Sequence, residues 1–314
     1  MDETIKVRLA LESDYMQVVK MSKGIYEGFD YLPQCYHVWL RQPNRHVFVA
    51  VAGEQIIGLT SAWLIDNGKT LLSQAGRVNP DYRGQGVYRK LEKEKCKFVK
   101  EKYPKVRVMR MTADNNGVLV HLKMGSQVFY ELAHIQWELK GEIGKGLLDA
   151  FLETTDNIVP SPYSKGEVKG NIIKNKGAVD ALFLKGDALI NWEVFKVGEQ
   201  TNFDLIFLKD DRMFAVQTSL DTFPESFSHG RLAARAVYLW TCTVYTADPV
   251  HLRAHLKQQL RVAMGVIQGA FHFEVFCDKD LAQKCQHDDP TARRTWSLFI
   301  LERDLNSTTI IDNL

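Results

Sequence analysis

The chain has 314 residues, of which 45% are hydrophobic, 11% aromatic and 25% charged. This composition is typical of globular proteins and excludes the collagen-like and disordered classes, and the length suits two domains of about 150 residues each. Forty Lys and Arg residues against 38 Asp and Glu residues leave a formal net charge of +2, too small for a protein that neutralises many phosphates of a nucleic-acid duplex. We therefore expect no nucleic-acid partner, whereas a compact anionic ligand is compatible with the charge.

The N-terminus and the metal-ligand pattern give expectations about the compartment and about metals. Met1-Asp2-Glu3-Thr4 is acidic where a secretory signal needs basic residues, and no apolar run approaches the ~20 residues of a membrane span. The five cysteines form no CxxC pair, and the histidines of the second half form no metal-ligand spacing. We expect a cytoplasmic protein with no membrane partner and no metal.

The first half of the chain predicts a mixed sheet flanked by helices. Strands are predicted at 5–9, 46–52, 55–64, 70–78, 105–111 and 127–139, and helices at 16–21, 36–40, 83–102 and 118–124. Turn signals at Gly53-Glu54 and Asn67-Gly68 join the second, third and fourth strands, which indicates an antiparallel meander. On the helix at 83–102, lysines alternate with Glu92, Glu94 and Glu101, which predicts a solvated face more readily than a phosphate-binding one.

The second half is predicted to repeat part of the first. Residues 156–170 are polar and rich in Pro, Ser and Gly, which predicts a linker between an N-terminal domain at 1–155 and a C-terminal domain at 171–314. Strands at 237–245, 270–276 and 296–301 alternate with helices at 251–267 and 281–285. We interpret this order as a degenerate second copy, in which Ala247-Asp248-Pro249-Val250 replaces a glycine-rich turn.

The most specific motif is Val78-Asn79-Pro80-Asp81-Tyr82-Arg83-Gly84-Gln85-Gly86-Val87-Tyr88, where a predicted strand meets a predicted helix. Glycines let a ligand approach the backbone, and the first turn of a helix offers unpaired N–H groups at the positive end of its dipole. The pattern fits a pyrophosphate site, and it also fits a plain tight turn.

This segment resembles motif A of the GNAT N-acetyltransferase superfamily, with Arg83, Gly86 and Tyr88 at the motif's defining places. The resemblance covers roughly residues 5 to 140 and implies an α/β protein with a tandem GNAT fold and acetyl-coenzyme A (acetyl-CoA) as cosubstrate. Tyr88 departs from the family pattern, which has a small residue there. The residues implied to bind the cofactor, through the pantetheine arm or the pyrophosphate, are Gly76, Val78, Arg83, Gly84, Gln85, Gly86, Val87 and Tyr88.

An aromatic stretch near the N-terminus is similar to the vertebrate histidine N-acetyltransferase group. It runs from Gly24-Ile25-Tyr26 through Asp30-Tyr31-Leu32-Pro33 to Tyr36-His37 and Trp39-Leu40-Arg41. The similarity implies acetyl transfer to the α-amine of free L-histidine in a ternary complex, giving N-acetyl-L-histidine. The alternatives are another amino acid, a polyamine or a peptide N-terminus as acceptor, or a non-catalytic CoA-binding protein.

Attack of an amine on a thioester needs a polarised carbonyl and a proton for the departing thiolate. We predict the Val78 N–H for the first task. GNAT enzymes commonly place an acidic Tyr four residues before a glycine, and counting back from Gly125 gives His121. The candidate bases are Glu27, which we favour, and Asp30, Gln74 and Glu131, with a water relay as the alternative. The candidates for binding the acceptor's carboxylate are Arg41, Arg77 and Arg110, and those for its imidazole are Tyr26, Asp30 and Glu131. Tyr31 of the aromatic stretch is a further candidate for binding the acceptor.

Overall fold

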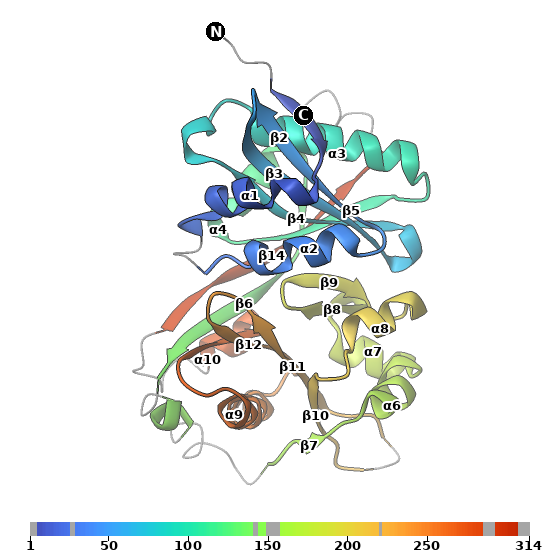
Figure 1. The fold of residues 1–314 in the computed structure, drawn as a ribbon. Helices are drawn as coiled ribbons and strands as arrows, with labels where there is room; N and C mark the ends of the chain where they lie inside the picture. Colours follow the sequence, from blue (N-terminus) through green and yellow to red (C-terminus); the bar gives the residue numbers. More distant parts are fainter. Residues whose placement is uncertain are drawn as a thin grey trace. The chain divides into compact units, whose positions relative to one another are not determined.

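The computed structural model describes residues 5–25, 29–140, 144–148, 158–219, 222–284 and 293–306 (Figure 1). Its internal contacts divide the chain into two compact units, Met1–Phe129 with Leu301–Leu314, and Tyr130–Ile300. This division does not follow the predicted domain limits, because the last residues of the chain return to the first unit. The predicted linker at 156–170 contains β7 (Ser161–Pro162) and α6 (Lys165–Glu167) in its described part.

The sheet of the first unit begins with an antiparallel meander. Its strands lie in the order β1 (Lys6–Leu9), β2 (Arg45–Ala52), β3 (Gln55–Ile65), β4 (Thr70–Val78) and β5 (Val108–Ala113). The first four strands pair antiparallel, and β4 pairs parallel with β5. The last residues of β14 (Arg293–Asp304) belong to this unit and lie beside β5.

Helices cover both faces of this sheet because β2 alternates its side chains between them. Val47 and Val49 point to the face where α1 (Tyr15–Ser22) and α2 (Leu32–Arg41) pack. Phe48 points to the opposite face and meets Phe98 of α3 (Val87–Lys102), with 5.4 Å between ring centres. The meander and the order of elements in the first half are confirmed.

The helix α3 begins at Val87 rather than at the predicted residue 83. Gly84 and Gly86 have φ angles of +78° and +75°, outside the right-handed helical region, so the helix cannot include them. The short α4 (Asn115–Lys123) begins earlier than predicted because the Asp114 side chain accepts hydrogen bonds from the N–H groups of Asn116 and Gly117.

The strands of the second unit also pair side by side. Its strands lie in the order β14, β6 (Gln127–Leu139, within this unit from Tyr130), β13 (Phe271–Cys277), β12 (Tyr238–Tyr245), β11 (Ser226–Ala234), β10 (Arg212–Val216) and β7. The long helix α9 (Pro249–Val266) buries Leu252, Leu256 and Leu260 against one face. The crossover from β12 through α9 to the parallel strand β13 repeats the β4–α3–β5 crossover of the first unit.

Residues 171–236, for which no element is predicted, also form helices and strands. They include α7 (Lys176–Leu182), the hairpin of β8 (Asp187–Ile190) and β9 (Glu193–Lys196), and α8 (Phe203–Ile206). The predicted turn at 281–285 is the helix α10 (Lys279–Lys284).

Candidate active site

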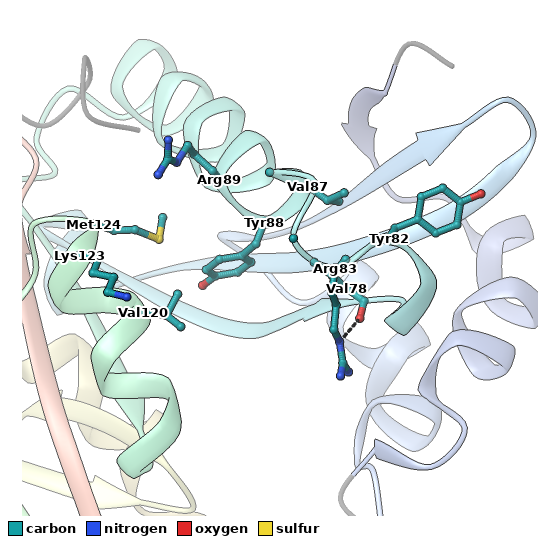
Figure 2. Close-up of a pocket in the computed structure, with 11 residues that line it drawn as sticks. Val78, Tyr82, Arg83, Val87, Tyr88, Arg89, Val120, Lys123 and Met124 are labelled. Atoms are coloured by element: carbon teal, nitrogen blue, oxygen red, sulfur yellow. Dashed lines mark hydrogen bonds between the residues drawn. The ribbon is translucent and has the colours of Figure 1, made fainter. Parts of the chain in front are cut away.

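A pocket of about 280 Å³ lies in the first unit, where β4 ends and α3 begins, with α4 as one wall (Figure 2). Six of the residues expected to bind the cofactor line it: Val78, Arg83, Gly84, Gly86, Val87 and Tyr88. Tyr82, Arg89, Val120, Lys123 and Met124 complete the lining. The pocket therefore coincides with the motif.

The turn into α3 presents backbone to this pocket. Gly84 and Gly86 take left-handed φ angles, and neither has another atom within 4 Å of the place that a Cβ would occupy. Gly86 is the N-cap residue of α3 and offers no side chain to cap it. The N–H groups of the first helical turn are therefore left for an anionic ligand.

The edge of β4 opens beside this turn. Strand β4 pairs with β5 from Thr70 to Leu72, and no strand in the described part of the chain pairs with that edge further on. The Asn79 N–H donates to the Ile57 carbonyl of β3 at 2.8 Å. Because successive residues of a strand alternate the direction of their polar groups, Val78 directs its N–H and C=O to the open edge. Arg83 Nε donates to the Val78 carbonyl at 3.3 Å, as Figure 2 shows.

A bulge in β4 precedes the open edge. Ala75 has a φ angle of +59°, and the register with β3 shifts between Leu59 and Ser61. A bulge of this kind bends a strand away from its neighbour. The open edge and the glycine turn together form a continuous backbone surface of the kind that binds an extended ligand ending in a phosphate group.

Tyr88 fits the pocket because Gly76 has no side chain. A Cβ built on Gly76 would lie 2.7 Å from Tyr88 Cε2 and 2.9 Å from the Tyr88 hydroxyl oxygen. Burial raises the pKa of Tyr88 well above its usual value, so the phenol keeps its proton at neutral pH. The large residue that departs from the family pattern is therefore accommodated by the sheet beneath it.

His121 of α4 packs edge-on against the Tyr88 ring, with 6.0 Å between ring centres. Burial lowers the pKa of His121 to about 4, so the ring is neutral near pH 7. The general-acid role of His121 stays a prediction, and a low pKa of this ring disfavours it.

The face of α3 beneath the pocket carries a buried ion pair. Glu92 and Lys95 are both 0% exposed and form a direct ion pair, and Lys95 Nζ also donates to Ser73 Oγ at 2.5 Å. Burial alone would raise the pKa of Glu92, but Lys95 outweighs it and holds that pKa below its usual value. The solvated face predicted for Glu92 is wrong, because this pair faces β3 and β4 rather than water.

Two of the candidate acceptor-binding residues neutralise each other in the first unit. Arg77 forms a direct ion pair with Asp30, and both are buried. The Arg77 guanidinium also lies over the Tyr31 ring, 5.4 Å from its centre. The expectation that Arg77 holds the acceptor carboxylate conflicts with this pair, whose charge is already compensated.

The remaining site candidates include Tyr26, Glu27, Glu131 and Gln85. Tyr26 and Glu27 lie outside the described residues. Glu131 belongs to the second unit, where it accepts from Lys279 Nζ at 3.0 Å and from the Ser297 hydroxyl. The pKa of Glu131 is held below its usual value, chiefly by the Ser297 hydrogen bond. The Gln85 side chain donates to the Asp81 carbonyl at 3.1 Å, which stabilises the turn.

Sequence reasoning missed the contribution of α4 to the pocket. Val120 is 47% exposed and Lys123 is exposed, and both reach the pocket together with Met124. The apolar residues of this short helix that remain at the surface, Leu119, Val120 and Leu122, are the signal that could have indicated a binding wall.

In the described part of the second unit, the β12–α9–β13 crossover lacks both features of this site. Strand β12 stays paired with β13 from Tyr238 to Thr243, so its edge does not open as that of β4 does. The helix α9 begins at Asp248, whose side chain accepts from the Val250 N–H at 2.7 Å. The unit has the crossover of the first unit without the open strand edge or the glycine turn.

Comparisons with known proteins find a different family for each half of the chain. Residues 11–124 match the acetyltransferase (GNAT) family, and residues 157–278 match the family described as histidine N-acetyltransferase, C-terminal. The first match contains the glycine turn and the open strand edge. Residues 11–124 are therefore similar to a GNAT acetyltransferase domain. A histidine N-acetyltransferase of Xenopus tropicalis is 42% identical over 107 residues, which are 34% of this chain and 33% of that protein. The chain thus aligns with a third of the length of this curated relative.

Solved structures share the fold over both units. A GCN5-related N-acetyltransferase from Sphaerobacter thermophilus superposes with a TM-score of 0.62 at 10% identity, covering 98% of this chain and 97% of that one. A tandem GNAT protein from the clavulanic acid biosynthesis pathway gives 0.55 at 11% identity, covering 97% and 100%. The predicted fold class, a tandem GNAT fold with a mostly antiparallel sheet, is confirmed. No helix in the described part of the chain combines the length and apolarity needed to cross a bilayer.

Proposed function

We propose that this protein transfers the acetyl group of acetyl-CoA to the α-amine of free L-histidine, with the GNAT domain holding the cofactor. The observation that carries the proposal is the open edge of β4 running into the glycine turn of α3. A pantetheine arm is an extended chain with amide groups, and it matches a strand edge. The pyrophosphate that follows it matches the N-terminus of a helix.

The charges around the pocket suit coenzyme A. The side chains of Arg83, Arg89 and Lys123 all line it, and each adds a positive charge near the helix N-terminus. No acidic side chain is part of the lining. The residues present therefore fit a polyphosphate, and we keep Gly76, Val78 and the turn from Arg83 to Tyr88 as the proposed cofactor contacts.

The proposed reaction is direct attack of the amine on the thioester. The amine nitrogen forms a bond to the carbonyl carbon, the carbon–sulfur bond breaks, the amine loses a proton and coenzyme A leaves as a thiol. The Val78 N–H points to the open edge of β4 and is the proposed donor to the carbonyl oxygen. Tyr88 retains its proton and lines the same pocket, so we propose its hydroxyl, in place of His121, as the hydrogen-bond donor to the leaving sulfur.

Histidine is proposed as the acceptor because of the second family match. The match over 157–278 names histidine N-acetyltransferase, and the curated Xenopus tropicalis relative carries the same name. Glu27 stays a proposed base. Another amino acid, a polyamine or a peptide N-terminus would use the same cofactor site and the same chemistry.

The test is release of free thiol from acetyl-CoA by the purified full chain, with each of the twenty amino acids, a polyamine and a short peptide as acceptors. We expect histidine to give the highest kcat/KM. A different best acceptor would reassign the substrate, and the absence of thiol release with every acceptor would contradict the enzyme proposal.

A non-catalytic CoA-binding protein is the second candidate, favoured by Tyr88 at the place of a small residue. Calorimetry of acetyl-CoA binding to Tyr88→Gly and to the parent chain separates the two. Because Gly76 makes room for the ring, we expect the substitution to leave affinity within a few-fold. A large gain in affinity would show that Tyr88 obstructs the site and would support the second candidate.

A further inference from the structure

The sheet of the second unit holds a histidine–carboxylate pair enclosed by aromatic rings. His134 Nε2 of β6 lies 2.8 Å from Glu274 Oε1 of β13. Phe276 stacks on the His134 ring at 4.7 Å between centres, and Trp192 and Trp296 meet it edge-on at 4.8 and 4.1 Å. Trp192 Nε1 also donates to Glu274 Oε1 at 3.2 Å. We call the group formed by this pair and the rings of Phe276, Trp192 and Trp296 the aromatic box.

Four buried polar atoms at this box have no hydrogen-bond partner among the described residues. They are Glu274 Oε2, His134 Nδ1, Thr241 Oγ1 and Asn191 Oδ1. Thr241 is the register neighbour of Glu274 on β12, and Asn191 precedes Trp192 between β8 and β9. A buried polar atom left without a partner costs about 1–3 kcal/mol, so the cluster lacks several donors.

A second histidine–carboxylate pair in the same unit shows what a self-sufficient pair looks like. Asp211 Oδ2 lies 2.7 Å from His229 Nε2, and the two Asp211 oxygens accept from Arg231 at 2.8 Å each. The Leu208 N–H donates to Asp211 as well, at 2.7 Å. Both carboxylate oxygens are therefore satisfied, whereas one oxygen of Glu274 is not.

The chemistry of the unpartnered atoms specifies their missing partner. Glu274 Oε2 and Asn191 Oδ1 are both acceptor oxygens without a donor. Burial alone would raise the pKa of Glu274, but His134, the Arg235 charge and, more weakly, Trp192 hold it below its usual value, so the carboxylate is charged at neutral pH. A charged acceptor surrounded by aromatic faces matches an N–H-donating cation.

The backbone also holds one wall of the box in an unfavourable conformation. Asn191 and Trp192 have φ angles of +49° and +70°, in the left-handed region that a bulky side chain rarely adopts. These two residues are the whole turn of the β8–β9 hairpin, and two-residue hairpin turns commonly need positive φ at both positions. Trp192 and Trp296 are only half-buried, so this side of the box faces the surface of the unit.

We propose that the aromatic box around Glu274 is a binding site for a small organic cation that donates N–H hydrogen bonds, an amine or an imidazolium. The site lies entirely within the second unit, which lacks the glycine turn. It goes beyond the proposed function, because it gives this unit a ligand site of its own. Free histidine carries both kinds of donor group, so the acceptor and a separate small cation are the two sources to distinguish.

The test is calorimetric titration of the full chain with imidazole, histamine and L-histidine, alongside Glu274→Gln. We expect binding to the parent chain and about tenfold or greater weakening in the variant, because a charge-assisted hydrogen bond is lost. Asp211→Asn is the matched control, which removes a buried carboxylate charge from the same unit without touching the box. It should lower stability and leave cation affinity unchanged.

A second variant guards against misfolding of Glu274→Gln. Thr241→Val removes an unpartnered hydroxyl while keeping its shape, so it should fold normally and weaken cation binding a few-fold. No binding of any of the three probes to the parent chain, or equal binding to both box variants, would overturn the proposal.

Thiol release measured separately keeps the two proposals distinct. Loss of cation binding in Glu274→Gln with an increased KM for histidine would identify the ligand as the acceptor. Loss of cation binding with an unchanged KM would identify a separate cation. Cation binding in a chain that releases no thiol would contradict the proposed function alone.

Discussion

The Tyr88 ring occupies the place that a side chain on Gly76 would need. A Cβ at Gly76 would approach Tyr88 Cε2 to 2.7 Å, closer than non-bonded carbon atoms come in folded proteins. The pair joins α3 to β4 next to the pocket, and each residue explains the other. A large residue at the helix start requires a glycine on the strand.

We predict that Gly76→Ala destabilises the protein by about 1–3 kcal/mol, because the added methyl group overpacks the contact. It should also weaken acetyl-CoA binding. The double variant Gly76→Ala/Tyr88→Ala should recover most of the lost stability, since the ring that clashes is gone. Chemical denaturation of the two single variants and the double variant measures the coupling, and additive effects would contradict the contact.

We predict that Gly86→Ala weakens acetyl-CoA binding more than its effect on stability explains. A Cβ at Gly86 meets no atom within 4 Å, but its φ of +75° costs an L-residue about 1–2 kcal/mol. Gly24 is the matched control, with a φ of +82° and equally open surroundings, and it does not line the pocket. Gly24→Ala should lose similar stability and keep its affinity. Equal affinities in both variants would argue against the turn as the phosphate site.

We predict that Glu92→Gln destabilises the protein by about 3–5 kcal/mol, because it leaves the Lys95 ammonium buried without its counter-charge. Replacing both residues, as Glu92→Gln/Lys95→Met, should cost less than the single change. Urea denaturation of the single and the double variant measures which of them loses more stability. A milder effect of the single variant would show that water reaches this part of α3.

We predict that stability falls as the pH drops from about 6.5 towards 4. Burial lowers the pKa of His121 to about 4 and that of His255 to about 3, below the unfolded value of 6.5. The unfolded chain therefore binds more protons in this window, which favours unfolding. The His255→Gln variant should lose less stability than the parent chain over this pH range, by on the order of a few kcal/mol. Thermal unfolding of both proteins at several pH values measures the loss. An equal loss of stability in the parent chain and the variant would contradict His255 as a cause of the pH dependence.

The same value of about 4 for His121 predicts the pH–rate profile. His121→Gln should keep the inflections of the parent profile between pH 6 and 8, because His121 does not titrate there. Loss of an inflection in that range would support His121 as the acid.

Tyr88→Phe should lower kcat with little change in KM, because it removes only the hydroxyl.

The sequence predicted the fold further than it predicted the site. Alternating and helical patterns located the meander from residue 46 to residue 78 and the crossover that follows it, because these elements bury one face each. The glycine turn was predicted as well, since Gly84 and Gly86 are local requirements of the backbone. The partners of the charged side chains were not predictable, because Arg77 meets Asp30 and Lys95 meets Ser73 only after distant segments pack together.

The sequence by itself determined the glycine turn before α3 and the absence of such a turn before α9, where Asp248 and Pro249 begin the helix instead. Only the tertiary structure decided which strand edge is open. Strand β4 separates from its parallel partner after Leu72, whereas β12 stays paired to Thr243. Strand separation depends on a bulge and on the packing of neighbouring elements, and neither is encoded in a local pattern.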